Sequence, residues 1–156
     1  MRLDKADNKS IWAAPTSDQT YTSNTTLADV AGCVLSLQAN QSYEIEGQII
    51  HDGDAAADIK LKCNIPAGAV LDVEYIAPNA AAASTVAAVN VADTGTSSQT
   101  EGEVGAGTLM AILIKGKIVM GSTPGNLQLQ AAQAASSAVT TTLHAQGSYI
   151  RAVPIR

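Results

Sequence analysis

The chain is poor in aromatic and charged residues. Among its 156 residues there are no Phe, one Trp and four Tyr, and Asp, Glu, Lys and Arg together make up only 15%. Ala, Val, Ile and Leu therefore supply most of the 46% hydrophobic content, which predicts a thin, closely packed aliphatic core. Because charged residues usually reach about 25%, much of the exterior must be Thr, Ser, Asn, Gln and Ala. Such a surface suits contact with other proteins.

Basic patches and long apolar runs are also missing. The net charge is −5 and the pI is near 4.8, which argues against nucleic-acid binding, since that requires a positive surface to neutralise phosphates. The opening segment, MRLDKADNKS, lacks the apolar stretch of a secretory signal. No run approaches the ~20 apolar residues of a membrane-spanning helix. We expect a soluble chain made in the cytoplasm, without a membrane partner.

Residues for catalysis or cofactor binding are scarce. The two histidines, His51 and His144, have no Ser or Cys placed by spacing as a nucleophile, so each is expected to be solvated or hydrogen-bonded. Asp52, Asp54 and Asp58 beside His51 could converge on calcium, but they lack the spacing of an EF-hand loop. A turn is the favoured interpretation. The sequence predicts no enzyme, no cofactor and no metal site.

The two cysteines, Cys33 and Cys63, lie on segments whose alternation points both side chains inward. They could therefore face each other across a core. Cytosolic synthesis favours free, buried thiols, which behave as small hydrophobes, although the sequence leaves a disulfide open.

The apolar stretch 108–121, TLMAILIKGKIVMG, has the period of two that is typical of a strand. Its even positions are expected to face the core throughout: Met110, Ile112, Ile114, Ile118 and Met120. Its odd positions begin with Leu109, Ala111 and Leu113, which we predict to contact another subunit, and end with Lys115 and Lys117 in solvent. The alternative is that the chain's own loops, such as 80–88, cover the odd face. Because the strand is long, Gly116 is predicted to bend or bulge it.

Turn signals separate further alternating segments. Asp52-Gly53 predicts a hairpin between residues 43–51 and 57–64, and Pro124-Gly125 predicts a second between 108–121 and 126–133. The Ala-rich stretch 80–88 is compatible with a helix on propensity, but a loop followed by a strand near 86–91 is favoured, and a short strand is possible at 101–104. Eight to ten short strands at this spacing indicate an all-β, jelly-roll-like β-sandwich.

The N-terminal residues 1–18 show no steady period and are predicted to form an extended arm, followed by one sandwich domain at 19–156. The only Trp lies in this arm, in the cluster Ile11-Trp12-Ala13-Ala14. Large apolar groups left in water usually mark a docking surface. Ile11 and Trp12 are therefore predicted to dock onto a partner or a neighbouring subunit, with a floppy tail as the alternative.

Four strand and turn motifs can be compared with known families: TSNTTL at 22–27, DGDAAADIK at 52–60, GNLQLQAAQ at 125–133 and GSYI at 147–150. They resemble motifs of small proteins encoded among the structural genes of tailed phages. In similar proteins the third motif often carries a Trp where Ala131 stands here. The resemblance covers roughly residues 20–153, and the N-terminal arm matches no pattern in that group.

The resemblance implies a jelly-roll subunit, typically a homotrimer, that decorates or cements a capsid. The implied partners are further copies of the chain and the major capsid protein, and the implied location is the virion surface. The alternative is a receptor- or carbohydrate-binding head domain of a phage tail fibre, which the small number of aromatic residues weakens. A glycosidase or other hydrolase has the least support, because the sequence specifies no acid–base pair.

Overall fold

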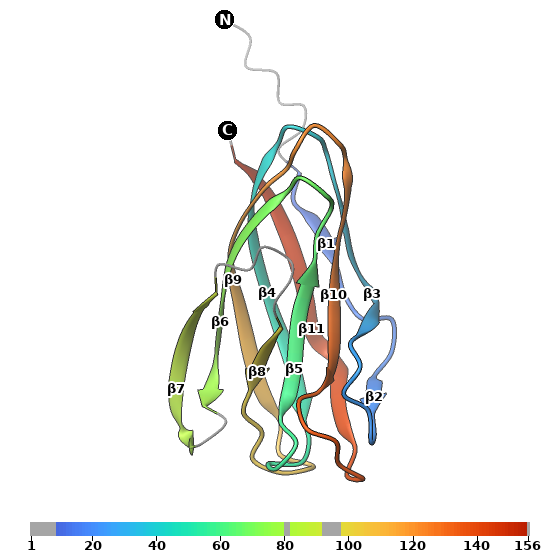
Figure 1. The fold of residues 1–156 in the computed structure, drawn as a ribbon, viewed down its shortest axis with the longest axis vertical. Helices are drawn as coiled ribbons and strands as arrows, with labels where there is room; N and C mark the ends of the chain where they lie inside the picture. The colour runs from blue at the N-terminus through green and yellow to red at the C-terminus, as the bar shows by residue number, and fades with distance from the viewer. Residues whose placement is uncertain (1–8, 80–81, 92–97, 156) are drawn as a thin grey trace, which may run out of the picture.

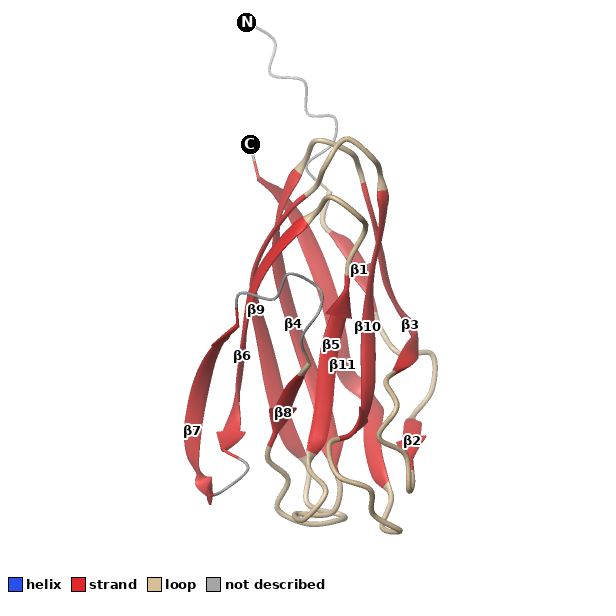
Figure 2. Cartoon of the chain, in the orientation of Figure 1, coloured by secondary structure: helices blue, strands red, loops and turns tan. Residues whose placement is uncertain are grey.

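The computed structural model describes residues 9–79, 82–91 and 98–155, with side chains described outside 78–97. These residues form strands, turns and loops without a helix, so none of them could span a membrane as a helix. Figure 2 shows long strands running between two ends where loops gather. The strands are β1 (Ile11–Ala13), β2 (Gln19–Tyr21), β3 (Ala28–Leu37), β4 (Ser42–Asp52), β5 (Ile59–Asn64), β6 (Val70–Asn79), β7 (Ala82–Val91), β8 (Gln99–Glu101), β9 (Met110–Val119), β10 (Gly125–Gln133) and β11 (Thr141–Ile155).

The strands form two antiparallel sheets with the strand order of a jelly roll. The large sheet runs β1-β11-β4-β9-β6-β7, with β2 also paired to β11, and the small sheet runs β3-β10-β5-β8 (Figure 1). Two short strands, β1 and β2, share the position of one jelly-roll strand beside β11, while β6 and β7 extend the large sheet beyond β9. The predicted all-β, jelly-roll-like sandwich is confirmed.

The core between the sheets is aliphatic, as the composition predicts. Along the longer strands whose side chains are described, alternate residues are largely buried, and the largest enclosed side chains are Leu and Ile together with Tyr43 and Tyr75. On β9 the even positions Ile112, Ile114 and Ile118 are fully enclosed, and Met120 is buried just beyond the strand. The prediction that this face belongs to the core is therefore correct from Ile112 onward, whereas Met110 at the start of β9 is only partly buried.

Both predicted hairpins are wrong as strand pairs. The strand β4 belongs to the large sheet and β5 to the small sheet, and β9 and β10 are divided in the same way. The turns after Asp52 and before Gly125 do reverse the chain, but each carries it across the core to the opposite sheet. Alternation shows only that one face of a strand is buried. It does not show whether the next strand along the chain pairs with it in the same sheet or packs across the core in the opposite sheet.

The predicted arm is partly a strand of the large sheet. Trp12 pairs with Arg151, and the flanking residues of β1 pair with Ala152 and Ile150 of β11. The predicted arm of 1–18 thus contains residues that belong to the sandwich, while residues 1–8 lie outside the described part. A three-residue strand is too short for its alternation to be recognised from sequence.

Two local predictions concern the chain's middle. The strand favoured near 86–91 is confirmed and begins earlier, at Ala82, where a loop was expected, while residues 80–81 lie outside the described part. Pairing with β6 outweighs the helix propensity of Ala. The short strand expected at 101–104 lies instead at Gln99–Glu101, beside β5. Tertiary pairing, which local propensity does not encode, decides both.

There is no bulge at Gly116, contrary to the prediction. The pairing of β9 with β4 and with β6 continues past this residue without a register shift. A Cβ atom at Gly116 would lie 2.1 Å from the carbonyl oxygen of Asp72 and 2.5 Å from the Cα of Val73. Glycine is needed here because the β6 backbone approaches so closely.

The two cysteines are buried in the same core and form no disulfide. Burial, with a smaller contribution from the nearby Cys63, raises the pKa of Cys33 to about 12. Both thiols therefore act as core hydrophobes, in agreement with the favoured interpretation of the sequence.

Candidate interaction surface

The outward face of the large sheet arranges its side chains in rows that cross the strands. One row contains Trp12 on β1, Arg151 on β11, Glu46 on β4, Lys115 on β9 and Glu74 on β6. The neighbouring row contains Tyr149, Gln48, Leu113 and Ile76 on β11, β4, β9 and β6. A charged row therefore lies beside a mainly apolar one.

Trp12 is the most prominent side chain of this face. It is 57% exposed, and its ring centre lies 5.2 Å from that of Tyr149 with an angle of 39° between the rings. The guanidinium of Arg151 lies 5.0 Å from the centre of the indole ring and is held by two hydrogen bonds to Glu46, one of them 2.6 Å from Nε to Oε2. The indole is thus fixed in place with part of its surface in solvent.

The predicted interface residues, Leu109 just before β9 and Ala111 and Leu113 on it, are also exposed. Leu109 is 64% exposed and Leu113 is 44% exposed, and Ala111 is exposed between them. In the alternative prediction the chain's own loops cover these positions, but all three residues are exposed. The sequence pattern placed them correctly on the face opposite the core.

A shallow depression of about 210 Å³ is lined in part by Tyr149, Leu113 and Ile76 of the mainly apolar row. Its lining comes from four neighbouring strands and consists of Tyr149 from β11, Glu46 and Gly47 from β4, Leu113, Ile114 and Lys115 from β9, and Ile76 from β6. Its side chains are apolar apart from Glu46, Lys115 and the Tyr149 hydroxyl. The depression therefore offers an apolar wall with one cation and one anion at its edge.

Ile11 lies on the opposite face of β1 from Trp12. It is partly buried and packs with Ala13 against the core, whereas Trp12 between them points outward. Because successive side chains of a strand point to opposite faces, adjacent residues of β1 cannot form one patch. Trp12 is therefore the exposed member of the predicted docking pair.

A second exposed apolar group escaped the sequence reasoning. Val70, Val119 and Ile155 are all exposed near the end of the same face, where Val119 pairs with both Val70 and Ser42, and Ser42 pairs with Ile155. The odd position of Val119 on its strand was an available signal. The pairing of β9 with β6, which brings in Val70, and the pairing of β4 with both β9 and β11, which brings in Ile155, could not be read from the sequence.

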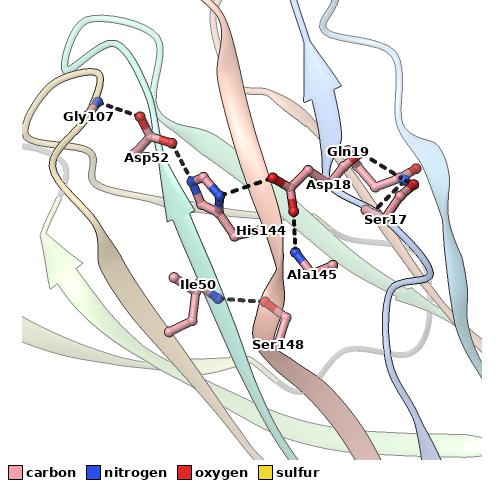
Figure 3. A network of polar contacts seen from close by, with 9 residues as sticks. All are labelled: Ser17, Asp18, Gln19, Ile50, Asp52, Gly107, His144, Ala145 and Ser148. Carbon is pink, nitrogen blue, oxygen red and sulfur yellow. Dashed lines mark hydrogen bonds and ion pairs between the residues drawn. The ribbon is translucent and has the colours of Figure 1, made fainter.

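Polar contacts gather at the end of the sandwich where β4 ends and β11 begins. His144 Nε2 lies 2.6 Å from Asp52 Oδ1, and His144 Nδ1 lies 3.4 Å from Asp18 Oδ2 (Figure 3). The other Asp52 oxygen accepts a hydrogen bond from the Gly107 N–H. Burial would raise the pKa of Asp52, but the Gly107 N–H and His144 hold it below its usual value.

The second histidine is enclosed in a similar network. His51 Nδ1 lies 3.2 Å from Glu103 Oε1, and the Thr141 hydroxyl donates to Glu103 Oε2 at 3.2 Å. All three side chains are buried. The prediction of hydrogen-bonded histidines is confirmed, and both networks tie loops together without opening onto the depression described above.

The acidic residues of the Asp52–Asp58 segment belong to a turn. Asp54 accepts hydrogen bonds from the Ala56 N–H and the Ser137 hydroxyl, and Asp58 accepts one from the Glu103 N–H. Within the described ranges no group of three or more His, Cys, Asp or Glu is arranged to hold a metal ion. These carboxylates satisfy backbone and hydroxyl donors, as the turn interpretation expected.

Comparison with known proteins adds little. No protein-family model and no curated protein matches the sequence. Among solved structures, that of the infectious bursal disease virus Gx strain is similar at 15% identity with a TM-score of 0.27, covering 94% of this chain and 38% of that one. The VP2 subviral particle of the same virus gives 13% identity and a TM-score of 0.22, with 94% and 39% covered.

This chain therefore spans less than half the length of the solved chains it matches. TM-scores this low do not establish a common fold. The strand order of the two sheets is the evidence for the jelly roll.

Proposed function

We propose that the chain is a non-enzymatic structural subunit of a virion, which forms homotrimers and decorates or cements the capsid. The observation that carries this proposal is the set of exposed apolar residues at alternate positions along one segment, Leu109, Ala111 and Leu113, on the outward face of the large sheet. The jelly-roll strand order and the motifs that resemble tailed-phage structural proteins support the same function.

The energetic reason for association is the apolar area left in water. Burying a leucine side chain contributes roughly 1.5–3 kcal/mol, and two leucines per subunit, at 64% and 44% exposure, are available on this face. Contiguous apolar patches are uncommon on monomers and mark interaction sites. A neighbouring copy is therefore expected to cover Leu109 and Leu113.

Attachment to the capsid is assigned to the acidic end of the sandwich. Loops there carry Asp18, Asp54 and Asp58 together with Ser and Thr residues, and the two histidine networks tie these loops to the strands. Three copies binding together would convert weak contacts with the major capsid protein into firm attachment. Adhesion, rather than chemistry, is the proposed mechanism.

Light scattering after size exclusion tests the trimer. The wild-type chain is expected to elute as a trimer at micromolar concentration, and Leu113→Asp is expected to give a folded monomer, because the charge cannot be buried unpaired. Val34→Asp, on the exposed face of the small sheet, is the matched control and should remain a trimer. A wild-type monomer refutes self-association, and unfolding of Leu113→Asp would place Leu113 in an internal core.

Virion fractionation with immunogold labelling tests the location. Labelling of the head surface is expected, whereas labelling confined to the tail would favour the alternative, a carbohydrate- or receptor-binding head. The adjacent rings of Trp12 and Tyr149 are the observation that favours this alternative. Glycan binding that Trp12→Ala abolishes would support it.

A further inference from the structure

Trp12 and the depression lie on the same face of one sheet, and the indole packs against Tyr149 at the rim of the depression without lining it. Trp12 stands on β1, at the edge of the sheet, whereas Leu113 and Lys115 stand on β9, three strands away. At about 4.8 Å between strands, this separation is roughly 14 Å. An exposed aromatic side chain and an open apolar depression therefore coexist on the same surface.

The depression has the size and lining to accept one aromatic side chain. Its volume of about 210 Å³ is too small for a folded element. Leu113 and Ile76 provide an apolar wall, and Tyr149, whose ring already packs against Trp12 of the same chain, adds an aromatic side to the depression.

The charges at the edge also suit an indole. Lys115 is exposed and makes no hydrogen bond or ion pair with other residues in the described ranges. Arg151 already contacts the Trp12 ring within its own subunit, and the indole is still more than half exposed. A lysine ammonium over the exposed part of the ring would add a second cation–π contact.

We propose that Trp12 of one subunit inserts into the depression between Tyr149, Leu113, Lys115 and Ile76 of a second copy of the same chain. This inference rests on the proposed self-association and names the contact that produces it. Trp12 is thereby assigned to the contact between subunits rather than to the capsid. Leu109 and Ala111 continue the same face and are covered by the same neighbour.

Both halves of this contact lie on the same outward face, so each subunit offers one indole and one depression to its neighbours. Two copies that meet face to face can make the contact reciprocally, which gives an isologous dimer, and copies related by a closing rotation can repeat it around a ring. The number of subunits is measured by light scattering.

The single Trp of the chain makes a direct test possible. Trp12→Ala removes the only tryptophan and the inserting side chain, and Leu113→Asp keeps the tryptophan but damages the depression. Each variant alone is expected to be monomeric by light scattering, with circular dichroism confirming the fold. Val34→Asp is the matched control and should keep the wild-type assembly.

Mixing the two variants is the decisive experiment. The indole of Leu113→Asp chains can enter the intact depression of Trp12→Ala chains, so their tryptophan emission should shift to shorter wavelength as Trp12→Ala protein is added. The mixture should also contain a two-chain species. Titration with Trp12→Ala protein that also carries Lys115→Glu should require a concentration about tenfold higher for the same shift, since the cation over the ring is lost.

The outcomes separate this inference from the proposed function. A wild-type oligomer that persists in Trp12→Ala, together with no emission shift on mixing, overturns the Trp12 contact but leaves self-association standing. A wild-type protein that is monomeric by light scattering overturns both. An emission shift and a two-chain species in the mixture support the contact.

Discussion

The guanidinium of Arg151 lies 5.0 Å from the centre of the Trp12 indole ring. Arg151 is in turn paired with Glu46 on the neighbouring strand. Three strands, β1, β11 and β4, are therefore linked on the outward face of the sheet by one chain of side-chain contacts. This chain holds the exposed indole in a single position, which lowers the entropy that a partner must remove on binding.

Arg151→Ala is expected to loosen the first strand. The variant loses a cation–π contact and a partly exposed ion pair, each contributing about 0.5–1 kcal/mol, so the unfolding free energy should fall by about 1–2 kcal/mol. Urea unfolding followed by tryptophan fluorescence measures this. Lys117→Ala, which alters an exposed charge on the same face, is the control. An equal loss in both variants would contradict a specific role for the Trp12–Arg151 contact.

Gly116→Ala is expected to be severely destabilising. The added Cβ would meet backbone atoms of Asp72 and Val73 at 2.1 and 2.5 Å, and the paired strands cannot separate without losing hydrogen bonds, so a loss of about 3 kcal/mol or more is expected. Gly68→Ala is the comparison: Gly68 has a φ of +80° but nothing within 4 Å of its added Cβ. That variant should lose only about 1 kcal/mol. Thermal melts distinguish the two, and similar melting temperatures would refute the close-approach explanation.

Glu101 predicts a pH dependence of stability. Burial raises the pKa of this carboxyl from 4.5 to about 7, so between these values the folded chain holds a proton that the unfolded chain has released. The stability contributed by Glu101 is therefore full below about pH 4.5 and is lost as the pH rises through about 7. Relative to wild type, Glu101→Gln should be about 1–3 kcal/mol more stable at pH 8.

Urea unfolding of both chains across this pH range measures the effect of Glu101. The difference between the two unfolding free energies, rather than either value alone, isolates this residue from the histidines and other carboxylates. The difference should grow from pH 5 to pH 8. A difference independent of pH would show that Glu101 is ionised normally in the folded chain.

The thiols of Cys33 and Cys63 should be unreactive in the folded protein. Both are fully enclosed, and the pKa of Cys33 is raised to about 12 by burial, so little thiolate forms near neutral pH. A chromogenic thiol reagent should label neither cysteine in buffer and both in denaturant. Rapid labelling of the native chain would contradict the enclosed core, and labelling of neither residue in denaturant would indicate a disulfide.

Much of this architecture could be predicted from local pattern. The alternation of Ile112, Ile114 and Ile118 against Leu113, Lys115 and Lys117 identified a strand with one face in the core, because strand side chains alternate between faces. It also placed Leu113 on the exposed face. The same rule failed for Ile11 and Trp12, since adjacent residues that looked like one apolar cluster lie on opposite faces of a strand too short to recognise.

Strand pairing could not be predicted from the sequence. Asp52-Gly53 predicted a chain reversal. Whether β5 would then pair with β4 or lie across the core depended on which of the two sheets could bury its apolar face. Likewise, nothing near Trp12 indicated that Arg151 and Tyr149, more than 130 positions away, would lie beneath it. Such contacts arise only when the sheet assembles, because pairing joins residues that are remote in the chain.

Local sequence pattern is enough to predict an all-β sandwich with an aliphatic core. It also predicts that strand β9 has one exposed face that begins with apolar residues. Periodicity, turn residues and composition are local properties, and they act through steric and hydrophobic rules that do not depend on distant residues. Which strands are neighbours depends on how the whole chain folds, and it is seen only in the assembled sheets. The tertiary structure thereby gathered Trp12, Tyr149, Leu113 and Lys115 on one face, because rows of side chains across a sheet exist only once the register of every strand is set.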